Sequence, residues 1–140
     1  MSKPSRRSNC PLHLSLNIVG DRWTLLILRD FIFEDARNFR EFIRKEGIAT
    51  NILSDRLNRL IENDIIQKEE DPTNASAIRY SLTKKGLELV PALIELYTWG
   101  SKHTADNDTD KQLRLRLEQD RQVLTDDIMN RLTITHQIGR

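Results

Sequence analysis

The feature that most constrains the fold is the segment from Phe39 to Leu60, FREFIRKEGIATNILSDRLNRL, in which two amphipathic patterns stand on either side of Gly47. Apolar residues recur at intervals of three and four in both halves, which places them on one face of a helix. The glycine ends the first helix, because glycine adopts the left-handed backbone of a helix C-terminus at little cost. The apolar faces are formed by Phe39, Phe42 and Ile43 before the glycine and by Leu53, Leu57, Leu60 and Ile61 after it. Two short helices joined by such a turn predict a helix-turn-helix unit.

Two helices are predicted before this unit. Residues 11–19 are mostly apolar and end at Gly20, which indicates a short helix with a glycine stop. Asp21 is placed to cap a second helix over residues 22–33, where apolar side chains occupy nearly the whole circumference. A helix with this pattern is expected in the core.

A hairpin is predicted after the unit. The pattern predicts two short strands, over residues 65–70 and 78–82, with a turn-rich segment between them. The hairpin is therefore expected to have a long flexible tip. Three helices followed by a two-stranded hairpin is the layout of a winged helix-turn-helix. We therefore expect an α+β fold, mainly helical, with residues 50–63 as the recognition helix and additional N- and C-terminal helices for dimerisation.

The last part of the chain predicts two more helices. Thr83 caps the first, which runs toward Trp99 and is bent or interrupted at Pro91, because proline lacks a backbone donor. Asn107 or Asp108 is expected to cap a single final helix. Its apolar stripe consists of Leu113, Leu117, Leu124, Ile128 and Leu132. The stripe suits either contact across a two-fold axis or the wall of an effector pocket, and the sequence leaves both open.

Composition bounds the class of protein. A chain of 140 residues with 22 Lys plus Arg, 21 Asp plus Glu and one cysteine is expected to form a single folded domain without an internal disulfide. No apolar stretch approaches the roughly 18 residues of a membrane span, so a cytoplasmic protein without a membrane partner is expected. The expected organisation is a flexible basic arm over residues 1–9, a winged helix domain over residues 10–103, and a linker with a C-terminal helix over residues 104–140.

Polar residues occupy the side of the 50–63 helix opposite its leucines. Asn and Arg can form paired hydrogen bonds with base edges, and Ser or Thr can bond bases or phosphates. We expect this face to enter the major groove of double-stranded DNA, with Thr50 or Asn51 also capping the helix. The candidate base-contacting residues are Thr50, Asn51, Ser54, Asp55, Asn58 and Arg59. The same residues also fit a solvated helix face without a partner.

Basic residues around this helix are candidates for contact with the phosphate backbone. Lys84 and Lys85 are the most informative, because they stand in the first turn of a helix, where the helix dipole disfavours cations and favours a bound anion. The full set of backbone candidates is Arg37, Arg40, Arg44, Lys45, Arg79, Lys84 and Lys85. The hairpin tip has no basic residue, so contacts there are expected from Asn74 and Ser76.

Catalytic residues, a metal and a cofactor are not predicted. His13, His103 and His136 are far apart and lack acidic companions at ligand spacing. The chain also lacks a glycine-rich phosphate loop and a nucleophile motif. The sequence therefore does not predict an enzyme.

Several short motifs together resemble the HxlR-type winged helix regulators of bacteria. They are Cys10-Pro11, GDRWTLLILRD from Gly20, FREF from Phe39, Gly47-Ile48, LSDRLNRL from Leu53, YSLTKKG from Tyr80 and Trp99-Gly100. The resemblance covers roughly residues 9–102 and implies a homodimeric DNA-binding transcription regulator, similar in broad plan to MarR proteins. Relatives usually have Ser-Pro where this chain has Thr50-Asn51, so the family's operator preference does not carry over.

The resemblance also draws attention to Cys10, since some relatives use a cysteine at this position to sense oxidants or electrophiles. A sensing thiol needs positive charge or a helix N-terminus nearby to lower its pKa. Arg6 and Arg7 supply the charge, and Pro11 indicates the start of a helix. A small buried apolar side chain is the alternative role of this cysteine.

The expected function is that of a homodimer on a palindromic or near-palindromic operator, with a small effector or a thiol-reactive signal as the candidate inputs. The alternative is a winged helix module for protein–protein interaction, which the net charge of +1 and the uncharged hairpin tip favour. Salt dependence distinguishes the two, because DNA affinity falls by roughly 0.9 log units per log unit of salt for each phosphate contact.

Overall fold

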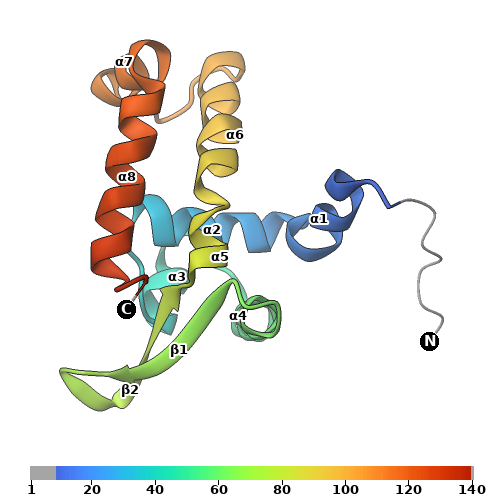
Figure 1. Ribbon diagram of the computed structural model, residues 1–140, viewed down its shortest axis with the longest axis vertical. Helices are drawn as coiled ribbons and strands as arrows, with labels where there is room; N and C mark the ends of the chain where they lie inside the picture. Colours follow the sequence, from blue (N-terminus) through green and yellow to red (C-terminus); the bar gives the residue numbers. More distant parts are fainter. Residues whose placement is uncertain (1–8, 140) are drawn as a thin grey trace.

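Ten elements follow one another in the computed structural model, which describes residues 9–139 apart from the side chain of Ala75 (Figure 1). The expected arm over residues 1–9 lies outside the described residues except for Asn9. The elements are α1 (Pro11–Val19), α2 (Arg22–Phe33), α3 (Phe39–Glu46), α4 (Thr50–Glu62), β1 (Ile66–Asp71), β2 (Asn74–Leu82), α5 (Lys84–Leu87), α6 (Val90–His103), α7 (Lys111–Gln119) and α8 (Arg121–Thr135). The mainly helical winged helix predicted from the sequence is confirmed.

Helix α2 lies at the centre of the fold. It crosses the molecule between the helix-turn-helix and the upright pair α6 and α8 (Figure 1). Phe31 is fully buried, and its ring lies 4.8 Å from that of Phe42 on α3, measured between centroids. Ile27 is buried on the same face as Phe31, one turn earlier, whereas Leu28 and Ile32 are buried on another face of the helix, as its nearly continuous apolar pattern predicted.

Two of the helix caps predicted from the sequence, Asp21 and Thr83, are confirmed. The Asp21 carboxylate accepts a hydrogen bond from the Thr24 backbone N–H at the start of α2. Asn38 forms a reciprocal capping box with Glu41 on α3, and Thr83 caps α5. Gly47 ends α3 in the left-handed conformation, with φ of 62°, so the chain turns sharply into α4.

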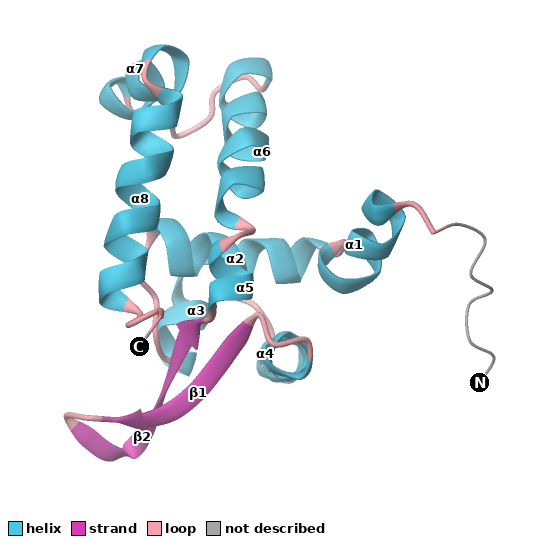
Figure 2. Ribbon diagram, in the orientation of Figure 1, coloured by secondary structure: helices cyan, strands magenta, loops and turns pink. Residues whose placement is uncertain are grey.

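The hairpin is longer and its tip tighter than predicted. The strands pair from Ile66 opposite Leu82 to Glu70 opposite Ile78, and after a register shift Asp71 pairs with Asn74. The predicted long tip is therefore wrong. The Asp71 side chain instead accepts from Thr73 N–H in the turn, and the Asn74 side chain accepts from Ser76 N–H opposite the register shift. Figure 2 shows the two strands joined by a short loop.

The last part of the chain differs from the prediction in one respect. The interruption near Pro91 is confirmed, since α5 ends at Leu87 and α6 carries the proline in its first turn. The single final helix is wrong, because the chain breaks at Asp120 between α7 and α8. The predicted cap is also wrong: Asp110 caps α7, while the Asn107 amide donates to the Ser101 carbonyl near the end of α6.

The apolar stripe of α7 and α8 is buried within its own chain. Leu117, Leu124, Ile128 and Leu132 all belong to the core cluster that surrounds α2. These four side chains are therefore not available to a partner subunit. Among the described residues, no helix has both the length and the apolar character required to cross a membrane.

Candidate nucleic-acid interface

Helix α4 presents one face to the core and the other to solvent. Leu53, Leu57 and Leu60 are buried against the rest of the fold. The residue that caps α4 is Ala49, whose side chain cannot accept a hydrogen bond, so the predicted cap at Thr50 or Asn51 is wrong. Those two residues lie instead inside the first turn, where their side chains are exposed.

The outer face of α4 consists of the polar residues predicted to contact bases. Thr50, Asn51, Ser54, Asp55 and Asn58 are exposed, and Arg59 is partly exposed. Within the described part of the chain, no side-chain hydrogen bond engages Thr50, Asn51, Ser54 or Asn58, although Asp55 pairs with Arg56 at 2.6 Å. This face therefore carries donors and acceptors that the fold itself does not use.

Arg56 attaches α4 to the start of α2, a contact that the sequence did not predict. Its Nε donates to the Asp21 carboxylate at 3.0 Å, while Arg59 lies farther from the same carboxylate, at 3.8 Å. Burial alone would raise the pKa of Asp21, but hydrogen bonds from Thr24 and Arg56 outweigh it and lower that pKa. Asp21 thus caps α2 and also holds α4 in position through Arg56.

Arg37, which the sequence predicted to contact the DNA backbone, is half-buried and makes hydrogen bonds within the fold. Its guanidinium donates to the Tyr80 carbonyl at 2.8 Å, to Ser81 Oγ at 2.7 Å and to the Thr135 carbonyl at 3.3 Å. Burial lowers the pKa of Arg37, and the nearby Arg79 adds to that effect. The residue therefore joins the loop before α3 to β2 and to the end of α8.

The other six basic candidates fall into two groups. Lys45 pairs with Glu34 at 2.6 Å, Arg79 with Glu69 at 2.8 Å, and Lys85 donates to the Asn63 carbonyl at the end of α4. Arg40, Arg44 and Lys84 are exposed, and no ion pair involves them within the described residues. The charges of these three exposed side chains are therefore available to pair with phosphate groups.

A groove of about 560 Å³ lies between α3 and the hairpin. Arg40 of α3 lines it together with Asn74 and Ser76 of β2, so the fold brings together one backbone candidate and both wing candidates. Helix α4 and the hairpin lie at the same end of the molecule, away from α7 (Figure 1). The arrangement offers a polar, partly cationic surface beside an exposed helix, which suits a nucleic acid.

Cys10 stands immediately before α1 as its N-terminal capping residue and is exposed. The backbone N–H groups of His13 and Leu12 lower the pKa of its thiol. The alternative role as a buried apolar side chain is therefore wrong.

The profile of the family described as HxlR-like helix-turn-helix matches residues 18–108. The chain belongs to this family. Its relatives are transcription regulators, and the HxlR-type resemblance noted from the motifs is confirmed.

Similar proteins include regulators of known sequence and of known structure. An HTH-type transcriptional regulator of Mycobacterium tuberculosis is 36% identical over 89 residues, which cover 64% of this chain and 56% of that protein. The chain thus spans little more than half the length of this relative. The structure of PA1607, a candidate transcription factor, matches at 34% identity with a TM-score of 0.66 and covers 75% of this chain and 72% of that one. The redox regulator HypR in its oxidized form matches at 26% identity with a TM-score of 0.60, covering 68% and 98%.

Proposed function

We propose that two copies of this HxlR-type regulator bind a palindromic or near-palindromic operator, each with α4 in the major groove. The observation that carries the proposal is the outer face of α4, where Thr50, Asn51, Ser54 and Asn58 are exposed and make no side-chain hydrogen bond within the described part of the chain. Amide and hydroxyl groups of this kind read base edges. Arg40, Arg44 and Lys84 would hold the phosphates beside the groove.

Exposed apolar side chains on α1 and α6 support the dimer. Leu12 and Leu16 on α1 are 66% and 55% exposed, and Leu96 and Trp99 on α6 are 57% and 61% exposed. Helix α1 has no buried residue of its own and projects from one side of the body (Figure 1). A contiguous patch of exposed apolar side chains marks a protein interface, and a dimer that brings together α1 and α6 of two subunits would cover these four side chains. Residues 104–140 would then form an element distinct from the dimer contact.

The first experiment is a selection of genomic DNA fragments with the purified protein at near-physiological salt, followed by footprinting. A protected two-fold site of about two helical turns is expected. The affinity should fall steeply with salt, by roughly 0.9 log units per log unit for each phosphate contact. Failure to enrich any fragment, with or without reductant, would instead favour the protein–protein interaction module.

The dimer is tested separately by light scattering on a size-exclusion column. Replacing both Leu16 and Trp99 by Glu should give a monomer, because two charges would be buried in the contact. Ile134→Glu is the matched control, since Ile134 is 78% exposed but lies on α8. A monomeric wild-type protein would contradict the dimer.

We also propose that Cys10 senses thiol-reactive oxidants. It is exposed at a helix N-terminus, its pKa is lowered by backbone hydrogen bonds, and the similar protein HypR is a redox regulator. Treatment with diamide, which takes two electrons from the Cys10 thiols of two subunits and joins them in a disulfide, should change operator affinity in the wild type and leave that of Cys10→Ser unchanged. An equal response of both proteins would show that the thiol is not the sensor.

A further inference from the structure

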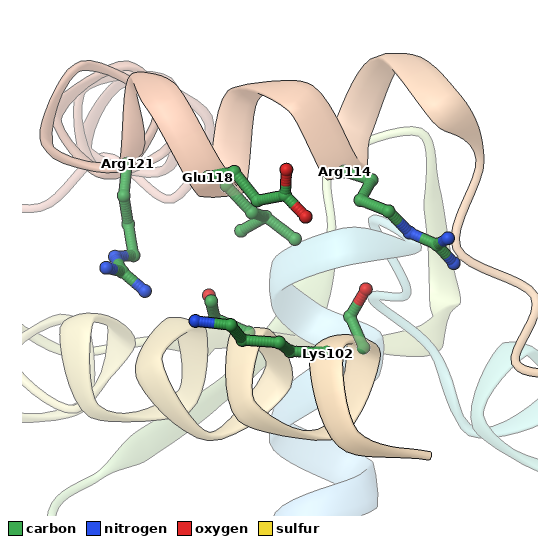
Figure 3. A pocket seen from close by; sticks show the side chains of 7 residues that line it. Lys102, Arg114, Glu118 and Arg121 are labelled. Carbon is green, nitrogen blue, oxygen red and sulfur yellow. The ribbon is translucent and has the colours of Figure 1, made fainter. Parts of the chain in front are cut away.

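A cleft of about 400 Å³ lies between α6 and α7, at the end of the molecule away from α4 and the hairpin (Figure 1). In Figure 3, Lys102 comes from α6, Arg114 and Glu118 come from α7, and Arg121 stands at the beginning of α8. The volume falls within the range of small-molecule sites in proteins. The nucleic-acid surface described above does not include any of these residues.

The charges around the cleft are unbalanced. Three cationic side chains, Lys102, Arg114 and Arg121, line it together with one carboxylate, that of Glu118. Within the described residues no ion pair engages Lys102, and Arg114 bonds only the neutral amide oxygen of Asn107, at 3.3 Å. Arg121 reaches the exposed Glu95 at 3.3 Å, outside the lining of the cleft. A cleft lined by one excess sign of charge concentrates ligands of the opposite sign.

A polar group within the cleft lining lacks a partner. The Oγ atom of Ser101 is buried, and no hydrogen bond to it exists in the described part of the chain. Its neighbour in the lining, Thr98, satisfies its hydroxyl by donating to the Ile94 carbonyl at 2.7 Å. Buried hydroxyls in folded proteins are nearly always paired, so an unpaired one beside three cations indicates a group that a ligand would complete. Leu117, which is 1% exposed, forms a small apolar part of the same lining.

We propose that the cleft between α6 and α7 binds a small organic anion, with its carboxylate held by Lys102 and Arg114 and its apolar part against Leu117. Ser101 donates its hydroxyl hydrogen to the same anion. A DNA phosphate is not the ligand here, because the cleft lies at the opposite end of the molecule from α4. A free inorganic anion would use the cations but not Leu117, so the two sources of negative charge can be separated by experiment.

Helix α8 connects the cleft to the hairpin. It begins at Arg121 in the cleft and ends at Thr135, whose carbonyl accepts a hydrogen bond from Arg37. Arg37 also donates to the Tyr80 carbonyl of β2, so α8 is linked to the hairpin through Arg37. We therefore expect a bound anion to affect the position of the wing. This consequence rests on the proposed function, whereas binding of the anion does not, so each can fail without the other.

The test is isothermal titration calorimetry on the full chain without DNA, using benzoate, inorganic phosphate and the neutral analogue benzyl alcohol. Saturable one-to-one binding of benzoate is expected, with phosphate and benzyl alcohol at least tenfold weaker. Replacing both Lys102 and Arg114 by Gln should weaken the binding of benzoate at least tenfold. Lys111→Gln is the matched control, because Lys111 is an exposed cation at the start of α7 outside the cleft.

Two single variants keep the proposal testable if the double variant does not fold. Ser101→Ala should weaken the binding of benzoate severalfold. Glu118→Gln should strengthen that binding, because the substitution removes the one carboxylate among the described residues that line the cleft. Absence of saturable benzoate binding, tighter binding of phosphate, or equal loss in Lys111→Gln would overturn the proposal. The effect on the wing is read separately, as a change in operator affinity on adding benzoate.

Discussion

The Nδ1 atom of His136 accepts a hydrogen bond of 2.9 Å from the backbone N–H of Leu82. The contact joins the residue that follows α8 to the last residue of β2, and both side chains are buried. The His136 ring also lies 6.0 Å from that of Phe31, measured between centroids. The C-terminal helix is thereby attached to the base of the hairpin.

The pH dependence of stability should show this contact. Burial, reinforced by Arg37, Arg131 and Arg79, lowers the pKa of His136 from 6.5 to about 3. Between these pH values the unfolded chain holds one more proton at this site than the folded chain. The free energy of unfolding should therefore fall as the pH drops below 6.5, by up to about 1.4 kcal/mol per pH unit from this group.

Urea denaturation at pH 7 and pH 5 measures the effect, with His136→Asn as the control. Asparagine has an acceptor oxygen for Leu82 N–H but does not titrate. The wild type should lose about 1–2 kcal/mol more than His136→Asn between the two pH values. Equal losses would mean that His136 is protonated in the folded state.

Arg37 and Arg40 should separate stability from DNA binding. Arg37→Met leaves the Tyr80 carbonyl and Ser81 Oγ without their donor, so we expect a loss of about 2–4 kcal/mol in the free energy of unfolding. Arg40→Met should change the free energy of unfolding by less than about 0.5 kcal/mol, because Arg40 is exposed. The same substitution should lower the affinity for DNA. Chemical denaturation measures stability, and fluorescence anisotropy measures DNA affinity. A loss of stability in Arg40→Met with unchanged stability in Arg37→Met would contradict both assigned roles.

Gly86 and Gly100 form a second matched pair. A Cβ atom at Gly86 would lie 2.2 Å from the Ile65 carbonyl oxygen, whereas one at Gly100 would meet nothing within 4 Å. Gly86→Ala should therefore cost about 2 kcal/mol or more, since backbone must move. Gly100→Ala, within α6, should stabilise by about 0.5–1 kcal/mol. Thermal melts of the two variants check the signs.

Arg59 and Lys84 should differ in what they contribute to DNA recognition. Loss of Arg59, at the edge of the outer face of α4, should reduce the discrimination between operator variants by about 1–3 kcal/mol. Lys84→Ala should instead weaken binding to all DNA sequences alike and reduce by about 1 the slope of log affinity against log salt concentration. Anisotropy titrations against a set of mutated sites separate the two, and equal losses on every sequence would contradict the assigned roles.

Signals contained in a few neighbouring residues could be predicted from the sequence. The caps at Asp21 and Thr83 and the turn at Gly47 depend on local geometry, which a short motif specifies. Asp120 interrupts the leucine stripe, but the seven-residue spacing from Leu117 to Leu124 keeps helical register, so the pattern predicted one helix where the structure has two. Packing of α7 and α8 on the core, rather than local preference, decides where that helix stops.

The roles of Arg37 and His136 depend on partners far along the chain. Arg37 bonds Ser81 and Thr135, which are 44 and 98 residues away. His136 and Leu82 are separated by 54 residues. A basic residue before a helix-turn-helix and a histidine near the C-terminus have many possible roles, so the sequence alone could not choose between a phosphate contact and a structural one.

The uncommitted outer face of α4 has an evolutionary consequence. Thr50, Asn51, Ser54 and Asn58 take no part in the core, and the buried leucines on the other side of the helix hold it in place. Substitutions on this face can therefore accumulate without unfolding the protein. Under the proposed function, a duplicated copy can acquire a new target through changes on this face while the buried leucines keep the body folded.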